Sequence, residues 1–574
     1  MKKQKNIFFK LLIFSIILVF CLSTIQITAQ KTDVRQDKNE NFNMRTVKLD
    51  NNVIKKRMQD KNFETKSVDF SSFSNSDEQV LAAEEYVGRP IVSGNGNGNA
   101  VFFIEYQDPY DPDKREIAAA PSYDNGATWD FDKSGAFPQD GGYNTLPALD
   151  FESDMTVYGS WIAEDKPGIT HMAKLDDISD PEAGDQWIYW TPDWSDNFED
   201  IGPFYSTDVA CYDGPLNEEP GVFWGIASWT GDLDDSEFGQ FERGIFLNYF
   251  SDQYIFISWF PDINGVYNIV SDIDQSTGVI YWAYEVYNPS TDVNDLWIMY
   301  ITMEDWFLEE SSFSIWEVEG PAKNPSIIAE DGNLIVAYES LGDIVCLYSS
   351  DIENSIESSV IAESGDDELY PALSKIDSDT VCAFNKNNDL YIATSENEGE
   401  TWTVKDDKIN DVSGSLKDEY HCVDLFEYRV FWSDTRETIA DVYSDSIYAA
   451  PNVPTITGSE NGKVNRNYDF TVTATHPDGL DLLYFIDWGD GTNTGWIGPF
   501  ESGESHTEQN SWSSKEEFVI RAKAKDAERG IESSWAEFSF STPKSKIKNI
   551  FNIQDLIQDL MDYFPILKQI FFWW

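Results

Sequence analysis

A short apolar segment recurs seven times between residues 85 and 450, and this repeat limits the fold more than any other feature of the chain. The second residues of successive copies are separated by 57, 61, 60, 57, 46 and 50 positions. In most repeats a second alternating strand follows the apolar segment about ten residues later. Repeated strands at a period near 50 are typical of the blades of a β-propeller. The sequence therefore predicts an all-β fold with a six- or seven-bladed β-propeller over residues 81–450. The seven segments, often opened by Pro, are Arg89-Pro90-Ile91-Val92, Leu146-Pro147-Ala148-Leu149, Thr207-Asp208-Val209-Ala210, Tyr267-Asn268-Ile269-Val270, Asn324-Pro325-Ser326-Ile327, Tyr370-Pro371-Ala372-Leu373 and Tyr420-His421-Cys422-Val423.

Seven starts predict seven blades, and six remain the alternative if one start is spurious. The last repeat ends near Ala450 after only three strands. A propeller blade normally has four strands. We therefore expect the stretch from Val80 to Glu85 to supply the missing strand and to close the ring.

Two stretches within the repeat share the pattern S-x-[DN]-x-G-x-T-W, from Ser122 to Trp129 and from Ser395 to Trp402. In such a turn the Ser and Asp or Asn side chains bind backbone N–H groups, while Gly adopts positive φ. The pattern resembles the Asp box of sialidase-type propellers, which implies a structural role in a blade and no activity. The residues that this resemblance assigns to the two boxes are Ser122, Asp124, Gly126, Trp129, Ser395, Asn397, Gly399 and Trp402.

A second domain is predicted over residues 451–543. A turn with the sequence Trp488-Gly489-Asp490-Gly491-Thr492 precedes an alternating strand from Phe518 to Asp526. This combination resembles the PKD domain, an Ig-like β-sandwich found on archaeal and bacterial surface proteins. The resemblance implies a role as a spacer.

The N-terminus carries an export signal. Lys2, Lys3 and Lys5 precede an uncharged apolar run from Leu11 to Leu22, and a small-residue cleavage pattern ends at Ala29. These features predict a Sec signal peptide over residues 1–29 and an extracellular or cell-surface location. Residues 30–80 are polar and lack a clear period, so we expect a disordered spacer.

Residues 544–574 form a distinct C-terminal tail. Apolar residues recur there every three or four positions until Pro565 interrupts the pattern, and nearly every residue from Ile566 to Trp574 is apolar. The stripe predicts a short amphipathic helix, and the apolar end is too short to span a bilayer. We expect the tail to dock on a membrane surface, a protein partner or the body of the chain.

The charge balance restricts the partners of the protein. The chain has 102 acidic and 40 basic residues, a net charge of −62. Nucleic acid carries the same sign and is excluded as a partner. No cofactor is required, but a Ca²⁺ ion would suit the acidic loop of Asp108, Asp111 and Asp113, with simple solvation of that loop as the alternative. A looser acidic loop contains Asp232, Asp234 and Asp235.

The sialidase resemblance also implies a possible chemistry. That family binds a carboxylated sugar with three arginines and uses a Tyr–Glu nucleophile pair and an Asp acid/base. Arg89 is the catalytic candidate, although Pro90 follows it directly, and Arg115 is the nearby substitute for a second arginine. A structural salt bridge is the alternative role for Arg89. The arginines available in the predicted propeller are Arg89, Arg115, Arg243, Arg429 and Arg436.

We therefore predict an exported binding or adhesion protein that recognises a glycan or an envelope protein through the propeller face. The alternative is a sialidase-like glycoside hydrolase. Convergence of three arginines, or of two suitably spaced carboxylates, at the propeller axis would distinguish the two.

Overall fold

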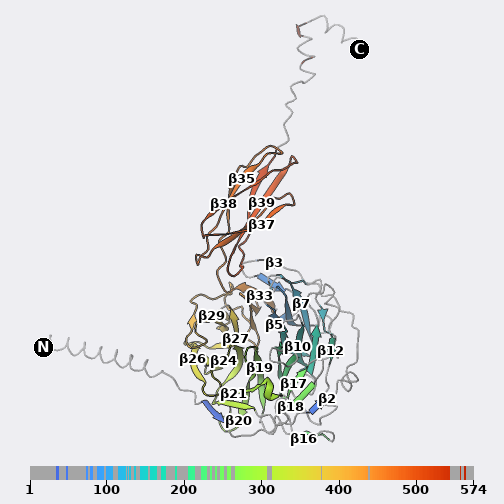
Figure 1. The fold of residues 1–574 in the computed structure, drawn as a ribbon, viewed down its shortest axis with the longest axis vertical. Coiled ribbons are helices and arrows are strands. Elements are labelled where there is room, and N and C mark those ends of the chain that lie inside the picture. Colours follow the sequence, from blue (N-terminus) through green and yellow to red (C-terminus); the bar gives the residue numbers. More distant parts are fainter. Residues whose placement is uncertain are drawn as a thin grey trace, which may run out of the picture. The chain divides into compact units, whose positions relative to one another are not determined.

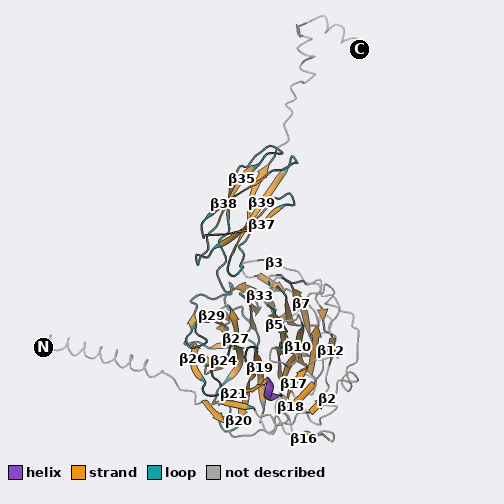
Figure 2. Cartoon of the chain, in the orientation of Figure 1, coloured by secondary structure: helices purple, strands orange, loops and turns teal. Residues whose placement is uncertain are grey.

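The structure is a computed structural model, and the chain divides into two compact units, residues 1–447 and 448–574. We call them the ring unit and the sandwich unit. Strands dominate both units, and α3 (Met303–Trp306) is a single short helix (Figures 1 and 2). The structure describes residues 34–37, 47–49, 73–74, 78–81, 87–95, 98–107, 114–123, 126, 128–130, 135–137, 143–152, 156–163, 170–175, 188–190, 204–213, 221–228, 233–235, 239–241, 246–250, 255–259, 265–306, 313–376, 378–436, 440–542, 556, 562 and 563.

Seven antiparallel sheets of four or five strands make up the described part of the ring unit, and neighbouring strands in a sheet mostly follow one another in the chain. A separate hairpin of β15 (Leu233–Asp235) and β16 (Gly239–Phe241) lies in the chain between strands of the third sheet. In chain order the sheets contain β5 (Val87–Gly94), β6 (Ala100–Gln107), β7 (Arg115–Ser122) and β8 (Gly135–Ala136); β9 (Asn144–Phe151), β10 (Val157–Ala163), β11 (Thr170–Leu175) and β12 (Ile188–Trp190); β13 (Phe204–Tyr212), β14 (Gly221–Ser228), β17 (Phe246–Phe250) and β18 (Ile255–Trp259); β19 (Val266–Asp274), β20 (Val279–Asn288), β21 (Val293–Thr302) and β22 (Ser314–Val318); β23 (Lys323–Glu330), β24 (Asn333–Ser340), β25 (Asp343–Ser349) and β26 (Glu357–Ala362); β27 (Glu368–Ile376), β28 (Asp379–Lys386), β29 (Asp389–Ser395) and β30 (Thr403–Val404); and β31 (Val423–Phe426), β32 (Arg429–Asp434) and β33 (Asp441–Ser446).

The first strands of these sheets contact one another in succession. β5 contacts β9, β9 contacts β13, and the series continues through β19, β23, β27 and β31, which in turn contacts β5. Sheets that radiate from a common centre in this way, with the first strand innermost, are the blades of a β-propeller. Each sequence repeat supplies the first strand of one sheet or the residues just before it, so the alternating pattern located the strands correctly.

Four short strands from the N-terminal segment add to the edges of these sheets, which differs from the spacer expected over residues 30–80. β1 (Val34–Asp37) pairs with β22, and β2 (Val47–Leu49) pairs with β18. β4 (Glu78–Leu81) pairs with both β33 and β3 (Phe73–Ser74). The unpaired N–H and C=O groups of an edge strand favour such pairing. Segments this short carry no periodicity that a sequence could reveal, so the expectation was wrong for these four segments.

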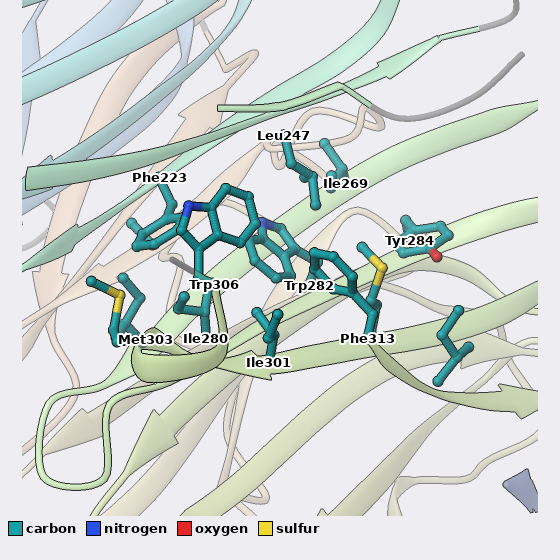
Figure 3. Packing of buried hydrophobic residues seen from close by; sticks show 14 of the residues in the cluster. Phe223, Leu247, Ile269, Ile280, Trp282, Tyr284, Ile301, Met303, Trp306 and Phe313 are labelled. Atoms are coloured by element: carbon teal, nitrogen blue, oxygen red, sulfur yellow. The ribbon is translucent and has the colours of Figure 1, made fainter. Parts of the chain in front are cut away.

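Aromatic side chains fill the core between the third and fourth sheets of the ring unit (Figure 3). Trp306 on α3 lies with its ring centroid 5.0 Å from that of Phe223 and 5.9 Å from that of Trp282. All three side chains are fully buried. Burying a large apolar side chain contributes about 1.5–3 kcal/mol, so the short helix is held in place by Trp306.

The sandwich unit, orange to red in Figure 1, has two antiparallel sheets. Along β39 exposed and buried residues alternate, as expected for a sheet with one face on the core. The core contains Trp512, Trp488, Phe470 and Tyr484. One sheet contains β34 (Thr455–Gly458), β35 (Tyr468–Thr473) and β38 (Ser505–Asn510), and the other contains β37 (Asn493–Phe500), β36 (Leu482–Asp487), β39 (Glu517–Asp526) and β40 (Ala536–Ser541).

Within the described residues, no helix has the length and apolar character needed to cross a membrane. The predicted signal peptide lies outside the described residues. The predicted tail helix also lies outside them, apart from Leu556, Asp562 and Tyr563, whose backbone is helical.

Candidate functional site

The two S-x-[DN]-x-G-x-T-W segments occupy the same place in two different sheets. The first connects β7 to β8 and the second connects β29 to β30, which are the third and fourth strands in each case. The hydroxyl of Ser122 accepts the N–H of Gly126 at 2.9 Å, and Ser395 accepts the N–H of Gly399 at the same distance. Both glycines have positive φ, 74° and 88°. Asp124 lies outside the described residues.

The remaining polar positions and the tryptophans of these segments have structural contacts. The side-chain oxygen of Asn397 accepts the N–H of Thr401 at 3.0 Å. The ring centroid of Trp129 lies 5.2 Å from that of Phe102 in its own sheet and 6.0 Å from that of Phe431 in the neighbouring sheet. Trp402 packs on the cluster that joins the fifth and sixth sheets. Both turns therefore bind adjacent sheets together, and the contacts of their described residues are structural.

A cavity of about 980 Å³ lies at the centre of the ring and is lined by the first strands of all seven sheets. We call it the channel. Its described lining is strongly acidic, because Lys375 is the one lysine or arginine there, and its Nζ atom lies 2.6 Å from Glu398. The carboxylates that line the channel are Asp150, Asp208, Asp213, Asp272, Asp274, Glu330, Asp331 and Asp424.

Four of these residues, Asp150, Asp208, Asp272 and Asp424, link neighbouring first strands, and we call them the channel aspartates. Each accepts a backbone N–H from the next sheet. Three of these bonds, from the N–H groups of Cys211, Ala329 and Val92, measure 2.7 Å, and the fourth comes from Ser271.

Burial changes the acidity of the channel aspartates. Desolvation raises the pKa of Asp150 to about 6 and those of Asp208 and Asp424 to about 7. Desolvation also raises the pKa of Asp272 well above its ordinary value. The backbone hydrogen bonds favour the charged form but do not outweigh burial, so Asp150, Asp208 and Asp424 titrate near neutral pH.

We call the end of the channel where the first strands begin the mouth. A cluster of charged side chains lies there, and unlike the channel aspartates its carboxylate stays ionised at neutral pH. Nη1 of Arg89 lies 2.7 Å from Oε2 of Glu105, and Arg115 binds the other oxygen of the same carboxylate. Glu105 is fully buried. Burial alone would raise its pKa, but the two guanidinium groups hold the pKa below its ordinary value.

This cluster bears on whether three arginines converge at the propeller axis, as the sialidase resemblance would require. Arg89 also donates from Nε to the carbonyl of Tyr420 at 3.2 Å, so the side chain is held in a structural ion pair. Arg429 donates to Ser444, and Arg436 pairs with Asp434 at 2.7 Å. Arg89 and Arg115 therefore converge on Glu105, a carboxylate of the protein itself. No third arginine among the described residues joins them. Arg243 lies outside those residues.

Two further carboxylates, missed from the sequence, stabilise strained backbone at the mouth. Glu285 accepts hydrogen bonds from the side chain of Asn268 at 2.6 Å and from the N–H of Asn324 at 2.7 Å. Glu339 accepts the N–H of Tyr370 at 2.6 Å. Burial raises the pKa of both Glu285 and Glu339. A glutamate near the end of the second strand in three sheets is the signal that could have identified them.

These bonds explain an unusual backbone. Six first-strand starts have a non-glycine residue at positive φ, where side chains normally clash with the backbone. Four of the six precede proline, a position that ordinarily favours extended backbone. Carboxylates that accept the N–H groups of Asn324 and Tyr370 offset this strain. The six residues are Arg89, Leu146, Asn268, Asn324, Tyr370 and His421, with φ between 48° and 59°.

Aromatic side chains remain at the mouth once these pairs are formed. The rings of Tyr420 and His421 lie 3.9 Å apart, and those of Tyr205 and Tyr267 lie 4.4 Å apart. The hydroxyl of Tyr420 is buried and has no hydrogen-bond partner among the residues described. Burial, with the charges of Glu285, Asp208 and Glu339, raises the pKa of Tyr420 well above its ordinary value.

The same environment lowers the pKa of His421, so this side chain is unsuited to proton transfer at neutral pH. Burial and the charge of Arg89 lower the pKa of His421 to about 3, so the imidazole is neutral at physiological pH. General acid–base catalysis needs a group whose pKa lies near the working pH and which can reach the substrate. Tyr420 stays protonated and His421 stays neutral, so this pair can bind a ligand but is poorly suited to transfer protons.

Most residues of the two acidic loops expected to suit Ca²⁺ lie outside the described part of the chain. Asp108, Asp111, Asp113 and Asp232 lie outside the described residues. Asp234 and Asp235 lie in strand β15, where they pair with Gln240 and Gly239 of β16. No group of three potential metal ligands occurs among the described side chains.

No protein-family model matches the chain, and no curated protein matches it in sequence. Among solved structures, the chain is similar to the PKD domain of an M14-like peptidase from a Thermoplasmatales archaeon, with 41% identity over 17% of this chain and 99% of that domain, at a TM-score of 0.17.

Two glycan-active enzymes are similar to a larger part of the chain. An α-L-arabinanase from Penicillium chrysogenum matches 66% of this chain and 98% of its own, with 10% identity and a TM-score of 0.35. An exo-β-1,3-galactanase from Phanerochaete chrysosporium matches 68% of this chain and 94% of its own, with 10% identity and a TM-score of 0.28. The strand pairing of this chain itself defines its fold.

Proposed function

We propose that this chain is an exported surface protein that binds a glycan at the aromatic mouth of a seven-bladed propeller and does not hydrolyse it. The succession of contacts among seven first strands supports seven blades, and the pairing of β4 with β33 supports closure of the last blade. The sandwich unit, which resembles a PKD domain, would act as a spacer.

One observation carries the proposal: the ionisable groups of the mouth are bound to the protein itself. Glu105 pairs with both Arg89 and Arg115, and Glu419 lies 3.7 Å from Arg89. Glu285 and Glu339 accept backbone N–H groups. What remains for a ligand is aromatic rings, together with the hydroxyl of Tyr420, which is buried beneath them and has no partner among the described residues until a ligand group reaches it. Aromatic rings pack against apolar faces and a hydroxyl fixes orientation, a combination suited to a sugar ring.

The alternative, a sialidase-like glycoside hydrolase, is favoured by one specific observation. Arg89 and Arg115 converge close to Tyr420, and arginine forks bind carboxylates in two places. For such an enzyme to act, the substrate would have to displace Glu105 from both arginines.

The test uses the mature chain in two assays. Retention on immobilised sialyllactose and lactose measures binding, and a fluorogenic sialoside measures hydrolysis. We expect retention without release of sialic acid, and weaker retention for Tyr420→Phe. Tyr123→Phe, in the β7–β8 turn beside Gly98, is the matched control and should bind as the wild type does. Sialic acid release that is lost in Arg89→Ala would establish the alternative instead.

A further inference from the structure

The outward face of the larger sheet in the sandwich unit carries a row of aromatic and cationic side chains. Phe485 on β36 pairs with Trp496 on β37 and with Lys523 on β39, so these three residues lie directly side by side across the sheet. Trp535, which immediately precedes β40, continues the row and is 42% exposed. We call these residues, together with Lys525, the outer row.

The outer row is closely packed. The ring of Phe485 lies 5.5 Å from that of Trp496 and 5.9 Å from that of Trp535. The ammonium of Lys523 lies 5.0 Å from the ring centre of Trp535, and that of Lys525 lies 4.5 Å from the ring centre of Trp496. These are cation–π distances, which fix the orientation of the rings.

The two lysines differ in whether a carboxylate pairs with their charge. Lys523 also pairs with Glu532, so its charge is neutralised within the sheet. Lys525 has no carboxylate partner among the residues described, and its ammonium lies over the ring of Trp496. Lys523 therefore positions the rings, whereas Lys525 offers a free positive charge beside an aromatic surface.

The position of these charges is unusual for this chain. Residues 448–542 contain 7 Lys or Arg and 15 Asp or Glu. Four of the seven cations, Arg521, Lys523, Lys525 and Arg529, lie within nine residues on or just after β39. Arg521, Lys523 and Arg529 pair with Glu537, Glu532 and Asp478, so Lys525 is the member of this group that can attract an anionic partner through local charge complementarity.

We propose that the outer row binds an acidic polysaccharide, with uronic-acid carboxylates at Lys525 and sugar faces on Trp496 and Trp535. The backbone groups on this face are already paired in the sheet, so side chains alone are available for recognition. A peptide that adds a strand would need a free sheet edge. A polysaccharide offers apolar ring faces and charges in one extended chain, which matches a flat row of rings and a cation.

Binding of the full mature chain to polygalacturonate, measured by affinity electrophoresis, tests this site. Neutral dextran and poly-L-glutamate serve as comparison polymers. We expect binding to polygalacturonate alone, weakened about tenfold by Trp535→Ala, as for an aromatic residue at the centre of a binding surface. Lys525→Gln should weaken binding several-fold and reduce its dependence on salt. Val519→Ala, on the same strand and face, is the matched control and should leave binding unchanged.

Several results would overturn the proposal. Equal binding to poly-L-glutamate would show that charge alone is recognised, and equal binding to dextran would show that charge is not used. Binding that appears only after removal of residues 544–574 would assign the face to the tail of the chain. If Trp535→Ala unfolds the sandwich unit, Lys525→Gln, which keeps every ring, decides the question. Tyr420→Phe should have no effect here, so this result is separate from that at the mouth.

Discussion

The ring unit and the sandwich unit are both built from antiparallel strands, but different interactions hold their sheets together. In the ring unit, neighbouring first strands are joined by partly buried carboxylates that accept backbone N–H groups, such as Asp424 with Val92. In the sandwich unit the two sheets enclose one apolar core centred on Trp512. A ring needs specific contacts at each junction between sheets, whereas a sandwich needs a single continuous core. The ring unit should therefore depend more on charge and pH than the sandwich unit does.

The largest effect is expected for Glu105→Ala. Removing this fully buried carboxylate leaves Arg89 and Arg115 without their common partner. Breaking a buried ion pair by removing one partner typically costs about 3–5 kcal/mol. Calorimetry of the mature chain should show the transition of the ring unit at lower temperature and that of the sandwich unit unchanged. A shift in both transitions would mean that the two units do not unfold independently.

Variation of pH should separate the units without any mutation. The folded pKa values of Asp150, Asp208 and Asp424 are raised to about 6 or 7, so the folded ring binds more protons than the unfolded chain between about pH 4 and pH 7. Stability that is fully present below about pH 4 is lost as the pH rises through this window, and each group contributes up to about 1.4 kcal/mol for every tenfold fall in proton concentration. Urea unfolding across this range should show the decline for the ring unit.

The control for the pH effect is Asp424→Asn, which cannot titrate. The amide keeps an oxygen that accepts the N–H of Val92, so the variant should retain the bond and lose part of the pH dependence. An unchanged slope in this variant would assign the pH dependence to other groups.

A smaller effect is expected where a turn joins two sheets. Gly399 has φ of 88°, and a Cβ atom at this position would lie 3.1 Å from Sγ of Cys346 in the neighbouring sheet. Gly399→Ala should destabilise the ring unit by about 1–2 kcal/mol, the cost of left-handed backbone for a residue with a Cβ. Gly414→Ala, also at positive φ but with open space around it, separates the backbone cost from the contact with Cys346. Equal losses in both variants would show that the contact contributes nothing.

The smallest effect is expected for Glu537→Ala in the sandwich unit. Glu537 pairs with Arg521 at 3.0 Å, but the two side chains are 59% and 50% exposed. Exposed ion pairs contribute about 0–1 kcal/mol, so the thermal transition should hardly move. The contrast with Glu105→Ala measures how far burial, rather than charge pairing itself, determines the stability of each unit. Similar losses in the two variants would contradict the comparison.

The sequence predicted what is periodic in this molecule and missed what is not. The apolar repeat located the first strands, because alternation and a spacing near 50 are properties of the chain alone. The serines and glycines of the two turns could be assigned because their pattern is local. Glu105, Glu285 and Glu339 were missed because a glutamate at the end of a strand looks like any solvated residue until its partners from other sheets are known.

The outer row was missed for a related reason. Phe485, Trp496 and Lys523 lie on three strands, and in the sequence each fits an ordinary pattern of alternating residues. Only the register of β36 with its two neighbours brings them together. Arg89 was identified from its place before Pro90, but whether it binds a ligand or a carboxylate of the protein depends on Glu105, in a different strand.

The pairing of β4 with β33 has a consequence for the order in which the protein forms. Leu81 pairs with Val442, so the last sheet is completed by a strand that is synthesised long before the rest of that sheet. During synthesis, the early strand must remain unpaired until residues near 442 follow it, and its exposed edge can meet other chains in the meantime. Joining such distant segments costs loop-closure entropy, which earlier sheets reduce as they form. Completion of this sheet is thus a natural final step of folding, and a chain that stops before β33 would leave strand β4 without its partner in that sheet.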